Sequence, residues 1–231
     1  MRVKLIAATS IIANIPGYVD HDLDGDEHER LTFIDDLCEQ CGRLCYEAWK
    51  RANPKTATNQ GYMANILEKC HFSVTEHGSA TFYIDGVTRN FTHELIRHRH
   101  LSYSEVSQRY VNVETFPFIE HPGLVDLGDE AREDLLAAIE AGRKAYASIM
   151  KDRTEKGIEG KQARQAARHA LVSGTETKIV VSGNMRAWRD MLWKRLDPTA
   201  DAEFRNVAKE ILVLLKQIAP NTFQDFDVPT A

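Results

Sequence analysis

The chain has 231 residues, of which 43% are apolar and 27% are charged, and its formal net charge is -5. This composition is typical of a globular protein that can bury a full core, so a single domain over residues 1–231 is the first expectation. The acidic balance argues against a general nucleic-acid-binding protein, because such proteins usually carry a basic excess. No apolar run reaches the roughly 18 residues of a membrane span. The apolar stretch at the start is too short for a signal peptide, so a cytoplasmic location is expected.

The spacing of apolar residues predicts the elements in chain order. A strand is expected over residues 1–8, a loop over 15–30, helices over 31–50 and 58–69, and a strand over 80–87. Helices follow over 89–99, 124–152 and 160–171, then a strand over 178–182 and helices over 187–196 and 202–218. Thr88 is expected to cap the helix after it, and Gly142 is a candidate break in the longest helix. Without regular strand–helix–strand alternation, the pattern favours an α+β fold over a doubly wound sheet.

The most informative segment is residues 97–109, with the sequence Arg-His-Arg-His-Leu-Ser-Tyr-Ser-Glu-Val-Ser-Gln-Arg. Arg97, Arg99 and Arg109 together can neutralise a dianion, because a guanidinium donates paired hydrogen bonds to phosphate and stays charged. Glu94 and Arg97 would share a helix face, which places an acceptor beside a donor, as a uracil or flavin edge requires. For an isolated RHRH, a solvated surface would be the preferred interpretation. The longer pattern with Ser107 and Arg109 favours a nucleotide site.

Two further basic sets occur later in the chain. Lys161, Arg164 and Arg168 are spaced to share one helix face, with an exposed surface as the alternative, and Lys161 is expected to be exposed. Counting the signature segment as the first basic set and Lys161, Arg164 and Arg168 as the second, the third set is Asn184, Arg186, Arg189 and Arg195, at a turn that starts a helix. A helix N-terminus attracts anions, and surface ion pairs are the alternative. The polar run 71–77 either forms internal hydrogen bonds or lines a site.

Two patterns suggest metal sites, and neither is favoured. Residues 20–25 match the opening of an EF-hand loop, but Leu31 stands where that loop needs a bidentate Glu, so a solvated acidic loop is preferred. Cys38, Cys41 and Cys45 fall on the apolar stripe of a predicted helix and are interpreted as small core residues, with metal as a minor alternative. No G-x-G-x-x-G or phosphate-binding P-loop occurs, and no G-x-S-x-G elbow supports Ser107 as a hydrolase nucleophile.

The pattern Arg97-His98-Arg99, seven residues, then Ser107 resembles the signature of the flavin-dependent thymidylate synthases. The similarity extends over 71–110, 161–168, 175–195 and 219–223, and is closest to actinobacterial members. The resemblance implies mixed helices packed around a mainly antiparallel sheet, and a homotetramer whose active sites are shared between subunits. It also implies that dUMP is converted to dTMP with the methylene of 5,10-methylenetetrahydrofolate and the electrons of NADPH, through bound FAD. Neither nucleic acid nor a membrane is implied as a partner.

The resemblance further implies roles for individual residues. Implied FAD contacts are His71, Ser73, Arg97, His98, Arg99, Glu105, Asn184, Met185, Arg186 and Asp190. Implied dUMP contacts are Glu94, Leu95, Ile96, Arg97, Glu105, Val106, Ser107, Gln108, Arg109, Arg168 and Arg195. Arg195 is expected to stabilise ionised N3 of the uracil, which makes C5 a better nucleophile. Ser107 is expected to position dUMP without attacking it, since reduced flavin delivers a hydride in this family, and no metal is implied.

Three departures and three alternatives remain. Asp190 stands where relatives often have His or Asn, Glu105 where close relatives have Gln, and 197–201 replaces a stretch that usually contains a His. A different flavoprotein reductase would oxidise NADPH without dUMP or folate. A nucleic-acid-binding module would be colourless and would bind in a salt-dependent manner. A metal protein built on the cysteines would contain iron or zinc.

Overall fold

The computed structural model describes residues 1–18, 33–51 and 53–227. The EF-hand-like segment 20–25 and most of the predicted loop 15–30 therefore lie outside the described residues. The chain divides into two compact units, which we describe separately. Unit 1 comprises Met1–Arg2, Ile84–Arg97 and Tyr103–Val180, and unit 2 comprises Val3–Tyr83, His98–Ser102 and Val181–Ala231. The single domain expected from the sequence stays a prediction.

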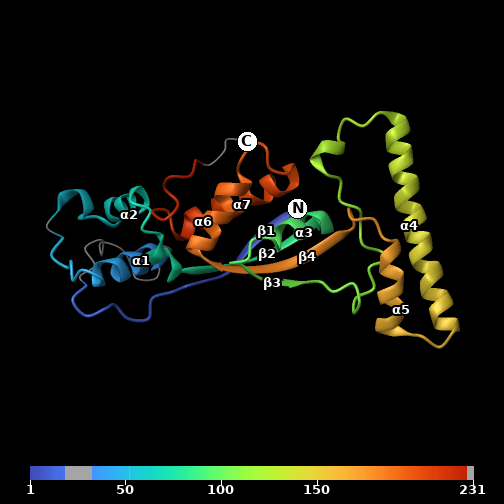
Figure 1. Cartoon of the computed structure of the whole chain (residues 1–231), viewed down its shortest axis with the longest axis horizontal. Helices are drawn as coiled ribbons and strands as arrows, with labels where there is room; N and C mark the ends of the chain where they lie inside the picture. Colours follow the sequence, from blue (N-terminus) through green and yellow to red (C-terminus); the bar gives the residue numbers. More distant parts are fainter. Residues whose placement is uncertain (19–32, 52, 228–231) are drawn as a thin grey trace. The chain divides into compact units, whose positions relative to one another are not determined.

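Four antiparallel strands form one sheet in the order β1-β2-β4-β3 (Figure 1). Their bounds are β1 Arg2–Ala8, β2 Ser79–Thr88, β3 Ser102–Glu105 and β4 Glu176–Asn184. Backbone hydrogen bonds set the register, from Thr9 N–H to Ser79 O (3.0 Å) and from Val106 N–H to Lys178 O (2.9 Å). Three strands and the α+β class are confirmed. Strand β3 was not predicted, because its four residues, Ser-Tyr-Ser-Glu, show no apolar alternation.

Unit 1 contains α3 (Arg89–Leu95), α4 (Asp129–Glu155), α5 (Gly160–Ala167) and the short 3-10 turns Pro122–Leu124 and Arg168–Ala170. Thr88 caps α3 as predicted, since its Oγ1 accepts the N–H of Phe91 at 3.0 Å. However, α3 ends four residues before the predicted end at Arg99, so Arg97 and Arg99 follow the helix.

The predicted break at Gly142 is wrong, because α4 runs through it without interruption. A Cβ at Gly142 would lie 2.8 Å from the carbonyl oxygen of Ala170. The glycine therefore allows α4 to pack closely against the chain that follows α5, and α4 and α5 run side by side in Figure 1.

Unit 2 contains α1 (Phe33–Leu44), α2 (Asn59–Glu68), α6 (Met185–Arg195), α7 (Ala202–Ile218) and the 3-10 turns Pro54–Thr56 and Phe72–Glu76. Its core includes Trp188, which meets Phe82 edge-on at 5.0 Å between ring centroids and donates to Ala80 O at 3.2 Å. The helix predicted over 202–218 is confirmed to the residue, because its apolar positions recur every three or four residues and are buried. None of the helices in the described ranges is long and apolar enough to cross a membrane.

The helix predicted over 31–50 ends at Leu44, because Glu47 and Arg51 both adopt a left-handed backbone with φ of 46°. Cys38 is buried and its thiol pKa is raised to about 12 by burial, as suits a core residue. Cys45 lies beyond the helix and is exposed, so its interpretation as a core residue is wrong. In the described ranges, no three His, Cys, Asp or Glu side chains gather to hold a metal ion.

The buried face of α1 carries charge as well as apolar residues. Glu39 accepts hydrogen bonds from Arg43 (2.6 Å) and from Asn59 of α2 (2.8 Å). Asp35 accepts the backbone N–H groups of Asn221 and Thr222 at 2.7 and 2.8 Å. Burial raises the pKa of Asp35 to about 6. These bonds tie α1 and α2 to the segment after α7, which the apolar pattern alone did not indicate.

Candidate active site

A cavity of about 440 Å³ opens at the start of α6 in unit 2, and we call it cavity A. It is lined by Glu76, His100, Asn184, Arg186, Ala187 and Asp190. Three of these, Asn184, Arg186 and Asp190, are among the residues for which the resemblance implies FAD contacts. The volume falls within the range of roughly 300–1,000 Å³ that is typical of small-molecule sites.

The turn into α6 shapes this cavity. Asn184 ends β4 and caps α6, since its Oδ1 accepts the N–H of Ala187 at 2.8 Å. Arg186 pairs with Glu76 at 2.5 Å, and Asp190 pairs with Lys194 at 2.7 Å, so the charges on the cavity wall are balanced. Met185 is fully buried, so only its backbone could reach a ligand.

His71 and Ser73 lie on the turn that joins α2 to β2, and both side chains are exposed. The turn begins at Cys70, whose left-handed φ of 55° ends α2. The N–H of His71 then donates back to Ile66 O at 3.0 Å. The same 3-10 turn, Phe72–Glu76, supplies Glu76 to cavity A.

Arg195 and His98 are joined directly within unit 2. The Nε of Arg195 donates to Nε2 of His98 at 2.9 Å, so the ring accepts there and is neutral in this arrangement. The guanidinium of Arg195 lies 4.4 Å from the centroid of the Phe204 ring, and His98 meets the same ring edge-on at 5.8 Å. His98 is buried. Two residues predicted to act at different ligands therefore hold each other in place.

The remaining residues of the signature segment differ in exposure. Arg97 and Arg99 are exposed and Glu94 is half-buried, as contacts to a ligand require. The predicted helix face shared by Glu94 and Arg97 is not formed as such, because α3 ends at Leu95.

Leu95 and Ile96, two of the implied dUMP contacts, differ in the exposure of their side chains. The side chain of Leu95 is fully buried, and its carbonyl accepts the hydroxyl of Tyr103 at 2.7 Å. Burial raises the pKa of Tyr103 to about 12, so this donor keeps its proton. Ile96 is 47% exposed and is open to contact.

Glu105 is a hydrogen-bond centre of unit 1. Its Oε1 accepts from Arg89 (2.8 Å), from Thr92 (2.9 Å) and from Thr177 (3.0 Å). One carboxylate oxygen thus links α3, β3 and β4. The sequence did not single out Arg89, Thr92 or Thr177, because each is an ordinary polar residue in its own element.

Residues 106–109 form the turn after β3. The N–H of Val106 pairs with β4, and Ser107, Gln108 and Arg109 are half-buried. The Oγ of Ser107 accepts a long hydrogen bond, 3.4 Å, from the N–H of Arg109. The Nε of Arg109 is buried and has no hydrogen-bond partner within the described part of the chain. An unsatisfied buried donor is costly, so this guanidinium is suited to a bound acceptor.

The second basic set lies beside this turn in unit 1. Arg164 donates to the carbonyl oxygen of Arg109 at 3.0 Å. Lys161 is exposed, as predicted, and lies 4.7 Å from the Tyr110 ring centroid, where its hydrogen bond lowers the pKa of Tyr110. Arg168 follows the end of α5 and starts a 3-10 turn, so it is not on the same helix as Lys161 and Arg164.

Arg189, from the third basic set, is structural. It is 7% exposed, makes two 2.7 Å bonds to Asp225 and one of 2.5 Å to Thr222 O. The interpretation of this arginine as an anion ligand is therefore not supported.

The predicted cofactor and substrate residues fall largely into different units. All implied FAD contacts except Arg97 and Glu105 belong to unit 2, and all implied dUMP contacts except Arg195 belong to unit 1. His100 and Glu76 also line cavity A, although no motif in the sequence marks either residue individually. The features that could have indicated them are the RHRH motif, whose second histidine is His100, and the polar run 71–77, which contains Glu76.

Comparison with known proteins identifies the family. A family model described as thymidylate synthase complementing protein matches residues 30–221. The chain is 46% identical to the flavin-dependent thymidylate synthase of Mycobacterium marinum over 237 residues, which cover 100% of this chain and 91% of that relative. The chain belongs to the flavin-dependent thymidylate synthase family. The flavin-dependent thymidylate synthases of Mycobacterium avium (strain 104) and Mycobacterium tuberculosis (strain H37Ra) are each 44% identical with the same coverage. The resemblance of the signature segment is thus confirmed, including its actinobacterial character.

Proposed function

We propose that this chain catalyses the reductive methylation of dUMP to dTMP, with 5,10-methylenetetrahydrofolate as carbon donor and NADPH as reductant. The observation that carries the proposal is full-length similarity to flavin-dependent thymidylate synthases, together with a cavity where the sequence implies flavin contacts. A methylene group must gain two electrons to become a methyl group. FAD, when bound, supplies the two-electron chemistry that passes them from NADPH.

The residues of cavity A fit a bound flavin nucleotide. Asn184 and Arg186 offer an amide and a cation at the N-terminus of α6, where backbone N–H groups favour anions. The carboxylates of Glu76 and Asp190 are neutralised by their ion pairs, which lowers their repulsion of a diphosphate. His71, Ser73 and Arg99 are exposed in the same unit and complete the proposed set.

For dUMP, the proposal assigns Arg109 and Arg168 to the phosphate. The unpartnered Nε of Arg109 supports this role, because a phosphate oxygen would satisfy it. Glu94, Ile96 and the turn 106–108 would contact the nucleotide around it.

Arg195 is proposed to act at the uracil. His98 and Phe204 fix its guanidinium, so little reorganisation is needed when negative charge develops on N3. A fixed cation there favours the anionic base and makes C5 more nucleophilic. Ser107 is proposed to position dUMP, and its Oγ acts as an acceptor instead of giving its proton to a base.

The proposal includes a homotetramer with shared active sites and a cytoplasmic location. Light scattering at several protein concentrations tests the assembly, and a monomeric active enzyme would contradict it.

The test of the reaction combines a spectrum with an omission assay. Purified protein is mixed with FAD, desalted and scanned, and dTMP formation is then measured with dUMP, methylenetetrahydrofolate and NADPH, each omitted in turn. We expect a retained two-band flavin spectrum and dTMP only in the complete mixture. NADPH oxidation without dTMP would indicate a different reductase, and a colourless protein would overturn the proposal.

A further inference from the structure

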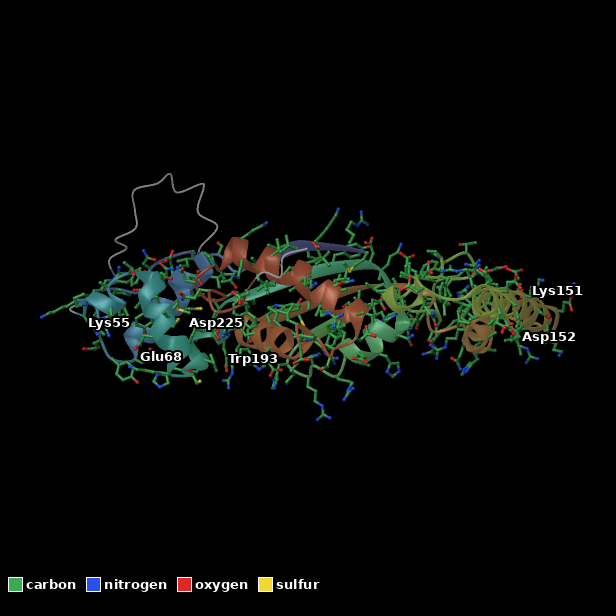
Figure 2. All side chains as sticks on the ribbon, turned by 90° about the horizontal axis from the view of Figure 1, so that it is seen from above. Lys55, Glu68, Lys151, Asp152, Trp193 and Asp225 are labelled. Atoms are coloured by element: carbon green, nitrogen blue, oxygen red, sulfur yellow. The ribbon has the colours of Figure 1, made fainter. Side chains whose placement is uncertain are left out.

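Unit 2 has a second cavity, cavity B, which the roles assigned above do not use. It measures about 490 Å³ and shares Arg186 and Asp190 with cavity A. Its other walls include Phe72, Arg189, Trp193, Asp225 and Phe226. Figure 2 labels Trp193 of α6 and Asp225 of the C-terminal segment. The volume suits a fused-ring ligand.

Trp193 is a large, exposed wall of this cavity. The residue is 72% exposed, although it is large and apolar. Phe226 meets it edge-on, with ring centroids 6.2 Å apart and planes at 81°. A largely exposed indole beside a second aromatic ring offers a stacking surface of the kind enriched at binding sites.

Arg189 is a rigid, neutralised part of the cavity. Its guanidinium lies 5.4 Å from the Phe72 ring centroid and 5.0 Å from that of Phe226. Asp225 holds it through two 2.7 Å bonds. Because Arg189 is 7% exposed and already paired, it does not make cavity B a phosphate site.

The polar edge of cavity B presents acceptors. The side chains of Asp190 and Asp225 are 45% and 37% exposed, and each is ion-paired, with Lys194 and with Arg189. An ionised carboxylate has about four lone-pair positions, so each retains acceptor capacity beyond its ion pair. The ion pairs leave no free cation among these groups for a phosphate, whereas an amino group on an aromatic ring would donate to the two carboxylates.

We propose that cavity B binds an amino-substituted heteroaromatic ring that stacks on Trp193. The inference rests on the proposed function, which supplies reactants with such rings: adenine in FAD and NADPH, and the pterin of the folate. Continuity with cavity A through Arg186 and Asp190 places this ring next to the proposed flavin site. Cavity B thereby becomes a second recognition point of the same active centre.

The test compares Trp193→Ala and Trp193→Phe with the wild type and with Tyr46→Ala. Tyr46 is a suitable control because it is 79% exposed in the same unit and does not line cavity B. Calorimetric titrations of the full-length protein use AMP, NADP⁺ and folic acid as probes, and the KM values for NADPH and methylenetetrahydrofolate are measured in parallel. We expect Trp193→Ala to weaken at least one probe about tenfold or more, since stacking on an aromatic side chain has that weight. Trp193→Phe should retain most of the binding.

The pattern of losses identifies the source of the ring. Weakened AMP with unchanged NADPH KM points to the adenine of FAD, weakened NADP⁺ with raised NADPH KM points to the reductant, and weakened folic acid points to the pterin. Affinities within twofold of wild type for all three probes would overturn the proposal, as would an equal loss in Tyr46→Ala. Failure of the proposed function is distinguishable, because it appears as absent dTMP formation in the wild type, whatever the probes do.

Discussion

The ligand residues proposed in unit 2 and those proposed in unit 1 differ in how their charges are paired. In unit 2, the cations around cavities A and B are already paired, as in Arg186 with Glu76 and Arg189 with Asp225. In unit 1, Arg109 keeps a buried Nε without a partner in the described part of the chain. This difference agrees with the proposal of a flavin site in unit 2 and a dUMP phosphate site at Arg109 in unit 1.

The sharpest contrast is between Arg195 of unit 2 and Ser107 of unit 1. Arg195→Ala should lower kcat for dTMP formation by about 10²–10³, because a preoriented group that stabilises developing charge is lost. Ser107→Ala should keep measurable turnover, since no bond to its Oγ is needed. Single-turnover assays with saturating dUMP measure both, and Arg195→Lys separates charge from orientation by His98. Complete loss of turnover in Ser107→Ala, with dUMP still bound, would contradict the role assigned to Ser107.

Asp35 of unit 2 and Asp152 of unit 1 should affect the pH dependence of the free energy of unfolding in different ways. Asp152 lies on α4 and is labelled in Figure 2. The pKa of folded Asp35 is about 6 against 3.8 unfolded, owing to burial. Its stabilising contribution is therefore complete below pH 3.8 and is lost as pH rises through 6, by up to about 3 kcal/mol. Urea unfolding from pH 4 to 8 should show the wild type losing stability relative to Asp35→Asn.

Asp152 is the matched control for this pH series. Hydrogen bonds from Lys156 and Arg153 lower its pKa, so its contribution is lost as pH falls. Because that pKa lies below 3.8, the difference between wild type and Asp152→Asn should stay nearly constant from pH 4 to 8. A flat difference curve for Asp35→Asn would contradict the effect attributed to its burial.

Loss of the Arg109 side chain in unit 1 should weaken substrate binding, because its Nε has no partner in the described part of the chain. Arg109→Ala should raise the KM for dUMP about 10- to 100-fold, because a hydrogen bond to a charged group contributes about 1.5–3 kcal/mol. The flavin spectrum should be unchanged. Arg132→Ala, which removes an exposed ion pair with Glu120, is the matched control and should leave the KM within about twofold. A loss of bound flavin in Arg109→Ala as large as its loss of dUMP affinity would contradict the proposal that unit 1 supplies dUMP contacts and unit 2 supplies flavin contacts.

The smallest effect is expected at cavity A. Arg186→Ala should weaken FAD binding about tenfold, since one partly exposed charge-assisted contact is lost. The KM for dUMP at saturating FAD should not change. Fluorescence titration of FAD measures the affinity, with Lys55→Ala of the same unit as control. Unaltered FAD affinity in Arg186→Ala would remove this arginine from the proposed site.

Local sequence signals predicted much of the fold. Period-two alternation identified β2, a threonine cap identified the start of α3, and the apolar spacing of 202–218 matched α7. These predictions succeeded because each depends on residues within one element. The signature segment likewise identified the family, since its residue types and spacing are contained in thirteen consecutive positions.

Tertiary structure decided what depends on partners distant in the chain. Several hydrogen bonds join residues that are far apart in sequence. They link Arg195 to His98, three donors to Oε1 of Glu105, and the backbone of 221–222 to Asp35. No local pattern specifies such partners, because a buried charge is stabilised by whichever donors the folded chain brings to it. The sequence by itself therefore determined the chemistry available to this protein. The tertiary structure decided which charges are used to hold the fold and which are left for a ligand.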